Sequence, residues 1–281
     1  MRLQVSQDVS LYYEIKGSGV PLVLLHGFTG THQTWAPYEA WGDRYQLILV
    51  DIVGHGESQV LNETDILVPY TMEAMAQALC QLLIHLNVRQ AVVLGYSMGG
   101  RLALYFATHY PDRVQALILE SASPGLSDEN ERESRRKHDE QLAEHLLTEG
   151  VTCFVNRWEN IPLFASQKKL PLSILERIRS ERLSQTAEGL AGSLKGMGTG
   201  SQPSLWGGLS DLQLPVFLIV GEWDEKFVTI AHRMDEKLPD SHLWVVQRAG
   251  HAVHVEQFDF FVKIVKDTIY TLLPKRDKPS A

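Results

Sequence analysis

The sequence predicts an α/β protein with a mostly parallel sheet flanked by helices. Short runs that are apolar throughout alternate with segments of helical periodicity, and such runs are typical of parallel strands covered on both faces. This alternation stops near residue 122 and resumes near residue 210, which predicts an insertion. The chain has 281 residues, 44% of them hydrophobic, and is therefore long enough for one large domain with an insertion.

Eight strands are predicted along the chain. Residues 2–15 alternate apolar and polar side chains, as two half-buried strands do. Continuous apolar runs predict six further strands, at residues 21–25, 47–50, 91–94, 116–119, 215–220 and 243–246. Helical spacing of apolar residues predicts the flanking helices, at residues 72–86, 101–107, 230–238 and 255–272. Strands that alternate with helices imply right-handed crossovers between parallel neighbours.

The interrupted region is rich in charge, has helical patterning and contains no convincing strand. We therefore predict a core domain formed by residues 1–121 and 211–281, and a helical lid formed by residues 122–210. Most of the lid's charges are expected on solvated helix faces. The insertion begins and ends beyond the carboxyl ends of strands, where ligands bind in open α/β sheets. This position suits a lid over a binding site.

Composition and charge limit which kinds of molecule the protein is expected to bind. The net charge of -8 argues against nucleic-acid binding but leaves room for an anionic small molecule. No run reaches the roughly 18 apolar residues that a membrane span needs. The start of the chain lacks the features of a secretory signal, and the two cysteines, Cys80 and Cys153, suit reduced thiols, so a cytoplasmic protein is expected. Neither a Walker motif nor a cysteine-based zinc site is present, and we expect no cofactor and no metal.

A nucleophile motif follows the strand at residues 91–94. Gly95, Ser97 and Gly99 form G-x-S-x-G between that strand and the next helix, which is the context that gives the motif its meaning. The two glycines allow two backbone segments to approach closely, so that the serine hydroxyl projects from a tight turn. The pattern predicts that Ser97 is the reactive residue.

A serine hydroxyl is a weak nucleophile and a weak base, so it needs an imidazole that a carboxylate orients. Asp224 and His251 each follow the end of a later strand, and the chain order Ser97, Asp224, His251 is that of a known triad arrangement. We expect the three side chains to meet at one edge of the sheet.

Other residues could fill the same roles. Glu120, Glu222 and Glu225 are alternative acids, and His254 is an alternative base. The backbone N–H groups of Met98 and Phe28 are expected to form an oxyanion hole.

These motifs, together with His26-Gly27 and residues 51–58, resemble the α/β-hydrolase superfamily over nearly the full length. Further segments resemble the 2-succinyl-6-hydroxy-2,4-cyclohexadiene-1-carboxylate (SHCHC) synthases of menaquinone biosynthesis. These segments are residues 95–101, 123–132, 154–164 and 196–206. The lid segments are the informative ones, since lids diverge faster than triads.

The resemblance implies a lyase that eliminates pyruvate from 2-succinyl-5-enolpyruvyl-6-hydroxy-3-cyclohexene-1-carboxylate to give SHCHC. This substrate has three carboxylates, and the resemblance implies that arginines bind them: Arg101, Arg132 and Arg182. It also places Tyr96 and Trp158 in the substrate pocket. Two alternatives stay open. One is a serine hydrolase that acts on esters or on C–C bonds of carboxylated ring-cleavage products, and the other is a ligand-binding member of the fold without turnover.

Overall fold

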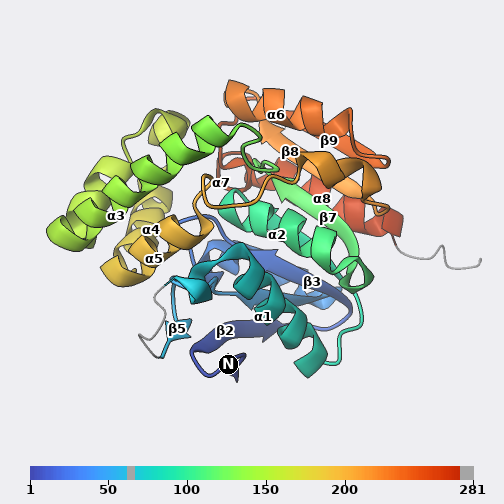
Figure 1. Ribbon diagram of the computed structural model, residues 1–281. Helices are drawn as coiled ribbons and strands as arrows, with labels where there is room; N and C mark the ends of the chain where they lie inside the picture. Colours follow the sequence, from blue (N-terminus) through green and yellow to red (C-terminus); the bar gives the residue numbers. More distant parts are fainter. Residues whose placement is uncertain (62–66, 273–281) are drawn as a thin grey trace, which may run out of the picture.

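The computed structural model describes residues 1–61 and 67–272 (Figure 1). Within them, one sheet of nine strands has the order β1-β2-β4-β3-β6-β7-β8-β9, with β5 paired to β2. The strands are β1 (Arg2–Gln4), β2 (Val9–Lys16), β3 (Val20–Leu25), β4 (Tyr45–Val50), β5 (Gln59–Val60), β6 (Ala91–Tyr96), β7 (Val114–Glu120), β8 (Val216–Gly221) and β9 (Ser241–Val246). The eight predicted strands form the main path, and β5, only two residues long, adds a ninth.

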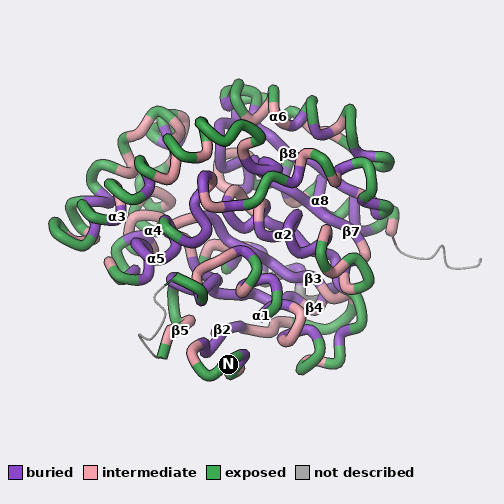
Figure 2. Tube along the Cα trace, viewed as in Figure 1, coloured by how far each residue is buried: buried purple, intermediate pink, exposed green. Residues whose placement is uncertain are grey.

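The sheet is mostly parallel, as predicted. Strand β2 pairs antiparallel with β1 and β4, whereas each neighbouring pair from β4 to β9 is parallel. The carboxyl ends of β3, β6, β7 and β8 therefore lie at the same edge. The central strands are buried on both faces, as Figure 2 shows by their colour.

Helices cover both faces of the sheet. One face packs against α1 (Met72–His85), α2 (Met98–His109) and α6 (Glu225–Asp235). The other packs against the 3₁₀ segment η1 (His32–Asp43) and α8 (Phe258–Leu272), which follows the short α7 (Val253–Glu256). The predicted helix at 255–272 is thus two helices, and α6 begins five residues earlier than its apolar spacing indicated.

Local capping fixes several helix starts. Thr71 accepts a hydrogen bond from the Ala74 N–H at the start of α1, because a hydroxyl can satisfy a free N–H of the first turn. The Asp128 carboxylate does the same for the Glu131 N–H in α3 (Glu129–Trp158). Shorter 3₁₀ segments complete the core: η2 (Val68–Tyr70), η3 (Pro111–Arg113) and η5 (Trp206–Asp211).

The insertion between β7 and β8 is helical, as predicted. After α3 it contains η4 (Pro162–Lys169), α4 (Leu172–Leu183) and α5 (Ala187–Met197). Helices α3 and α5 share a small hydrophobic core of their own, formed by Ala143, Leu146, Phe154, Val155, Leu190, Ala191 and Leu194. Figure 1 shows this insertion beside the carboxyl edge of the sheet. The boundaries at residues 122 and 210 stay a prediction, and residues 273–281 of the predicted core lie outside the described residues.

None of the helices in the described part of the chain is both long enough and apolar enough to cross a membrane.

Candidate active site

Ser97 occupies a strained turn between β6 and α2. Its φ of 51° lies in the left-handed region, which is uncommon for a residue other than glycine. A Cβ at Gly95 would overlap the Gly99 carbonyl, and a Cβ at Gly99 would overlap the Leu25 carbonyl of β3. The two glycines therefore have the steric role that the motif predicted, because side chains there would push the turn away from the sheet.

Ser97, His251 and Asp224 form one hydrogen-bonded chain. The Nδ1 atom of His251 lies 2.6 Å from Oδ2 of Asp224, and its Nε2 atom lies 2.9 Å from the Ser97 hydroxyl. Both His251 and Asp224 are buried. A proton on Nδ1 that is donated to the carboxylate leaves Nε2 free to accept the serine proton. The chain is thus arranged for proton transfer from Ser97.

The alternative acids and base lie elsewhere. Glu120 pairs with His254, whose Nδ1 lies 2.9 Å from Oε1 of Glu120. Glu222 accepts a hydrogen bond from the Arg248 N–H, and Glu225 is exposed at the start of α6. Of the acids considered from sequence, Asp224 is the one that contacts His251.

The loop after β3 lies against the serine turn. A Cβ at Gly27 would be 2.7 Å from the Tyr96 ring and 3.6 Å from Cβ of Ser97, so only glycine allows this approach. Buried His26 accepts a hydrogen bond from the Ile52 N–H, and its Nδ1 atom lies 2.8 Å from the Gly27 carbonyl. Burial lowers the pKa of His26, which favours the neutral ring. His26 therefore shapes the loop, and Phe28 and Met98 both reach the same cavity.

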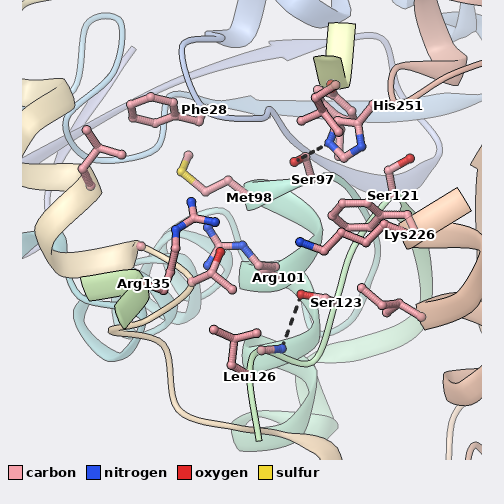
Figure 3. Close-up of a pocket in the computed structure, with 18 of the residues that line it drawn as sticks. Phe28, Ser97, Met98, Arg101, Ser121, Ser123, Leu126, Arg135, Lys226 and His251 are labelled. Carbon is pink, nitrogen blue, oxygen red and sulfur yellow. Dashed lines mark hydrogen bonds between the residues drawn. The ribbon is translucent and has the colours of Figure 1, made fainter. Parts of the chain in front are cut away.

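This cavity has a volume of about 400 Å³ and opens beside Ser97 and His251 (Figure 3). Both the core and the helical insertion contribute to its wall. The aromatic part of the wall consists of Phe28, Tyr96, Trp158, Phe164, Trp206 and Phe227. Serine hydroxyls and several cationic side chains supply the polar part, which suits a small molecule that carries both a ring and charged groups.

Four cationic side chains line the cavity: Arg101, Arg135, Lys226 and Arg233. Arg101 donates to two neutral acceptors, the Met197 carbonyl at 2.8 Å and Oε1 of Gln202 at 2.7 Å. Burial lowers the pKa of Arg101 to about 10, so the side chain stays charged at neutral pH. Arg101 thus presents a half-buried positive charge whose hydrogen bonds go to neutral acceptors. The Asp139 carboxylate stabilises this charge through space, but it is already paired with Arg135.

The other three cations differ in their contacts. Arg135 pairs with the buried Asp139 at 2.9 Å, and burial raises the pKa of that carboxyl despite the arginine. Arg233 lies over the Trp206 ring at 4.5 Å, whereas Lys226 is exposed at the cavity wall. Figure 3 shows the Lys226 side chain pointing toward Arg101.

Some predicted binding residues reach the cavity and others do not. Tyr96 and Trp158 line it, and their contact with substrate stays a prediction. Arg132 pairs with Glu129 on α3 and is absent from the cavity wall. Arg182 is buried against the Phe164 ring, 4.8 Å away, and lines a smaller cavity of about 60 Å³ that adjoins the first through Phe28, Tyr96 and Phe164.

Sequence reasoning missed Arg135, Lys226 and Arg233. Arg135 lies three residues after Arg132, on the same side of α3, and Lys226 follows Asp224 by two residues. For both residues, the short sequence distance from a predicted site residue was a signal that they could reach the site. Within residues 1–61 and 67–272, no group of three or more His, Cys, Asp or Glu side chains is placed to hold a metal ion.

Residues 20–258 match the family model of the alpha/beta hydrolase fold, and the chain therefore belongs to that family. A provisionally named SHCHC synthase of Bacillus subtilis (strain 168) is 46% identical over 252 residues, which cover 89% of this chain and 90% of that protein. The SHCHC synthase of Enterobacter sp. (strain 638) is 32% identical over 84% of this chain and 86% of its own length. The structure of MenH from S. aureus matches with a TM-score of 0.87 and 35% identity, over 95% of this chain and 99% of that one. Within the hydrolase fold, the chain belongs with the SHCHC synthases.

Proposed function

We propose that the protein is an SHCHC synthase, which eliminates pyruvate from 2-succinyl-5-enolpyruvyl-6-hydroxy-3-cyclohexene-1-carboxylate. The observation that carries this proposal is the joint position of two features in one cavity. The Ser97–His251–Asp224 chain supplies a base, and Arg101 supplies a half-buried cation whose hydrogen-bond acceptors are neutral. A substrate carboxylate could form a charge-assisted hydrogen bond with Arg101, whereas a neutral ester has no group that pairs with this charge.

In the proposed reaction Ser97 acts as a base rather than as a nucleophile. His251 takes the serine proton while Ser97 removes a proton from the ring carbon beside the succinyl ketone. The C–H electrons move onto the ketone oxygen, and the N–H groups of Phe28 and Met98 stabilise the negative charge there. When the enolate collapses, the ring C–O bond breaks, and the enolpyruvyl group leaves and takes up a proton to become pyruvate.

The substrate's three carboxylates require several cations. We assign Arg101 to one of these carboxylates. Lys226 and Arg135, which is paired with Asp139, are assigned to carboxylates at the open part of the cavity wall. Arg132 and Arg182 remain candidates that a movement of the insertion would have to bring in. The insertion, in this proposal, acts as a lid. A cytoplasmic location is part of the same proposal, and the free thiols of Cys80 and Cys153 are compatible with it.

A direct assay tests the proposal. The purified protein is supplied with the enolpyruvyl precursor, and pyruvate is measured by a coupled enzyme while the absorbance of the cyclohexadiene is followed. Equal amounts of both products are expected, and Ser97→Ala should lose several orders of magnitude in rate. Absence of pyruvate with intact wild-type protein would refute the synthase assignment.

Arg101→Ala should lower kcat/KM for this substrate by about tenfold to a hundredfold, because a charge-assisted hydrogen bond is worth roughly 1.5–3 kcal/mol. Arg89→Ala is the matched control, since Arg89 is exposed after α1 and away from the cavity. An unchanged kcat/KM in Arg101→Ala would remove this residue from substrate binding.

Ester hydrolysis is a second candidate. The Ser97 hydroxyl faces the cavity and lies 2.9 Å from the imidazole Nε2, a geometry that also serves nucleophilic attack. This candidate predicts turnover of p-nitrophenyl esters that carry no carboxylate, with little effect of Arg101→Ala. Comparison of the two substrates in one preparation separates the candidates.

A further inference from the structure

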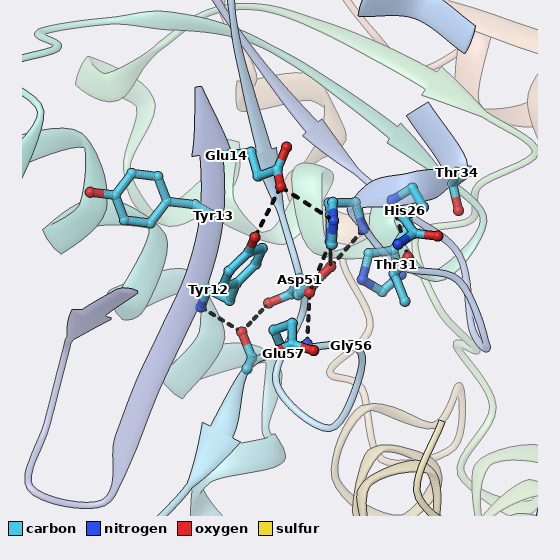
Figure 4. Close-up of polar contacts among 12 residues, drawn as sticks. Tyr12, Tyr13, Glu14, His26, Thr31, Thr34, Asp51, Gly56 and Glu57 are labelled. Carbon is cyan, nitrogen blue, oxygen red and sulfur yellow. Dashed lines mark hydrogen bonds and ion pairs between the residues drawn. The ribbon is translucent and has the colours of Figure 1, made fainter. Parts of the chain in front are cut away.

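The loop of residues 26–31, here the oxyanion loop, connects β3 to η1 and carries the Phe28 N–H. On one side it is anchored to the core (Figure 4). His26 bonds to the Ile52 N–H, and next to the loop the His32 N–H and ring both lie within 2.9 Å of the Asp51 carboxylate. Burial disfavours a charged His32, but the Asp51 carboxylate outweighs it and raises the pKa of His32. These contacts hold the loop to the sheet.

The other side of the oxyanion loop is held by the helical insertion. A single carboxylate oxygen of Glu181, near the end of α4, accepts three hydrogen bonds. They come from the Thr31 N–H at 2.7 Å, the Thr31 hydroxyl at 2.9 Å and the Thr34 hydroxyl at 2.7 Å. Hydrogen bonds to an ionised acceptor are roughly twice as strong as neutral ones. Glu181 is therefore a strong link between insertion and loop.

Gln185, one turn further along the chain, adds a second link. Its amide nitrogen lies 3.3 Å from the carbonyl oxygens of both Thr29 and Gly30, and its Oε1 accepts from the Gly56 N–H at 3.1 Å. Thr29 has a φ of 69°, which is costly for a β-branched residue. Such a conformation persists only where its surroundings enforce it, and the buried Gln185 is part of those surroundings.

The Phe28 side chain makes a third contact with the insertion. Its ring packs edge-on against Trp158 at 5.4 Å and Phe154 at 6.1 Å, both from α3. The residue that supplies the predicted oxyanion donor is thus held by α3 through its ring, and by α4 through its loop.

We propose that Glu181 is a positioning residue that couples the seating of the insertion to the geometry of the oxyanion hole. The inference rests on the proposed function in one respect, the role of the Phe28 N–H. With Glu181 in place, α4 fixes Thr31 three residues beyond Phe28. Without it, Thr31 and Thr34 lose their shared acceptor and the loop relaxes toward solvent. A displacement of about 1 Å at a stabilising group can cost roughly a hundredfold in rate.

The kinetic test uses the intact protein and the enolpyruvyl precursor. Glu181→Ala should lower kcat by about tenfold or more, with a smaller change in KM, because the lost interaction acts in the transition state. Glu181→Gln should restore kcat to within a few-fold, since an amide oxygen can still accept from the N–H and hydroxyls. Glu176→Ala, an exposed position on the same helix, is the control and should match wild type. A raised KM with unchanged kcat would overturn the coupling and leave only a lid contact.

A second measurement does not depend on activity. Hydrogen exchange followed by mass spectrometry should show faster exchange in a peptide that contains residues 27–34 for Glu181→Ala, but not for Glu176→Ala, while peptides from β6 and β7 stay protected. Unchanged protection of the loop in Glu181→Ala would refute the proposal that Glu181 positions the loop, even if the variant is active. Conversely, the wild-type protein could release no pyruvate while Glu181→Ala still exchanges faster than Glu176→Ala in the loop. That result would refute the proposed function and support the Glu181 contact with the oxyanion loop.

Discussion

Two histidines three residues apart, His251 and His254, each pair with a carboxylate at the same edge of the sheet. Asp224 follows β8 and lies 2.6 Å from Nδ1 of His251, whereas Glu120 ends β7 and lies 2.9 Å from Nδ1 of His254. The Tyr96 ring lies close to both imidazoles, at 5.5 Å and 4.6 Å. By residue type and by local pairing the two sites are nearly equivalent.

The two His–carboxylate pairs differ in what surrounds each imidazole ring. The Nε2 atom of His251 faces the Ser97 hydroxyl and the cavity, so the ring can accept a proton from a reacting group. The His254 ring packs among Trp35, Tyr96 and Phe261, and Glu120 also accepts the His254 backbone N–H. The same pairing therefore serves proton transfer in one place and packing beneath the site in the other. Access of the second ring nitrogen decides between these roles, and residue type does not.

Matched substitutions test this contrast in activity. His251→Ala should lower kcat for pyruvate release by about a thousandfold or more, because Ser97 loses its proton acceptor. His254→Ala should stay within about tenfold of wild type, because its ring does not touch Ser97. Both are measured by steady-state kinetics at a temperature where circular dichroism shows each variant folded. Comparable losses in the two variants would break the distinction.

The order of effects should reverse for stability. His254→Ala leaves the fully buried Glu120 without its imidazole, and removal of one partner of a buried pair costs about 3 kcal/mol. His251→Ala should cost less, about 1 kcal/mol, since Asp224 and His251 also line a separate surface pocket, from which solvent can replace the ring. Urea unfolding at neutral pH measures both. A larger loss for His251→Ala would show that the first pair also has the main structural role.

The sequence predicted the His251–Asp224 pair because both residues sit at fixed, short distances after strands. Strand ends are local features, and parallel strands bring their carboxyl ends together, so the pattern converts directly into spatial proximity. The nucleophile turn was predictable for the same reason. Sequence alone could not exclude Glu120 and His254, because their pairing depends on how α7 packs beneath Tyr96.

The cavity wall was less predictable. Arg132 and Arg135 lie three residues apart on α3, yet Arg135 lines the cavity and Arg132 does not. The sequence pattern of a charge-rich helix does not distinguish two such neighbours, because the placement of α3 depends on long-range packing such as its contact with α5. The two-residue β5 and the 3₁₀ segment η1 were missed for a related reason, since neither is long enough or regular enough to show a period.

A third buried histidine extends the comparison to a ring that is paired with no carboxylate in the described part of the chain. Burial lowers the pKa of His55, which lies beside His26 and Phe28, to about 3 from an ordinary value of 6.5. The unfolded chain binds a proton below pH 6.5 and the folded chain does not until about pH 3, so this contribution to stability is complete above pH 6.5 and is lost as the pH falls through that window.

Between pH 6.5 and 5.5, His55 should lower the free energy of unfolding of the wild type by about 1 kcal/mol. The limiting slope is roughly 1.4 kcal/mol per pH unit once the unfolded ring is charged. His55→Leu removes the titrating ring and should flatten that part of the profile by the same amount, whatever its stability at pH 7.5. Urea unfolding at several pH values provides the measurement. Identical slopes in the two proteins would mean that His55 is not held neutral, and that burial without a carboxylate does not determine its protonation.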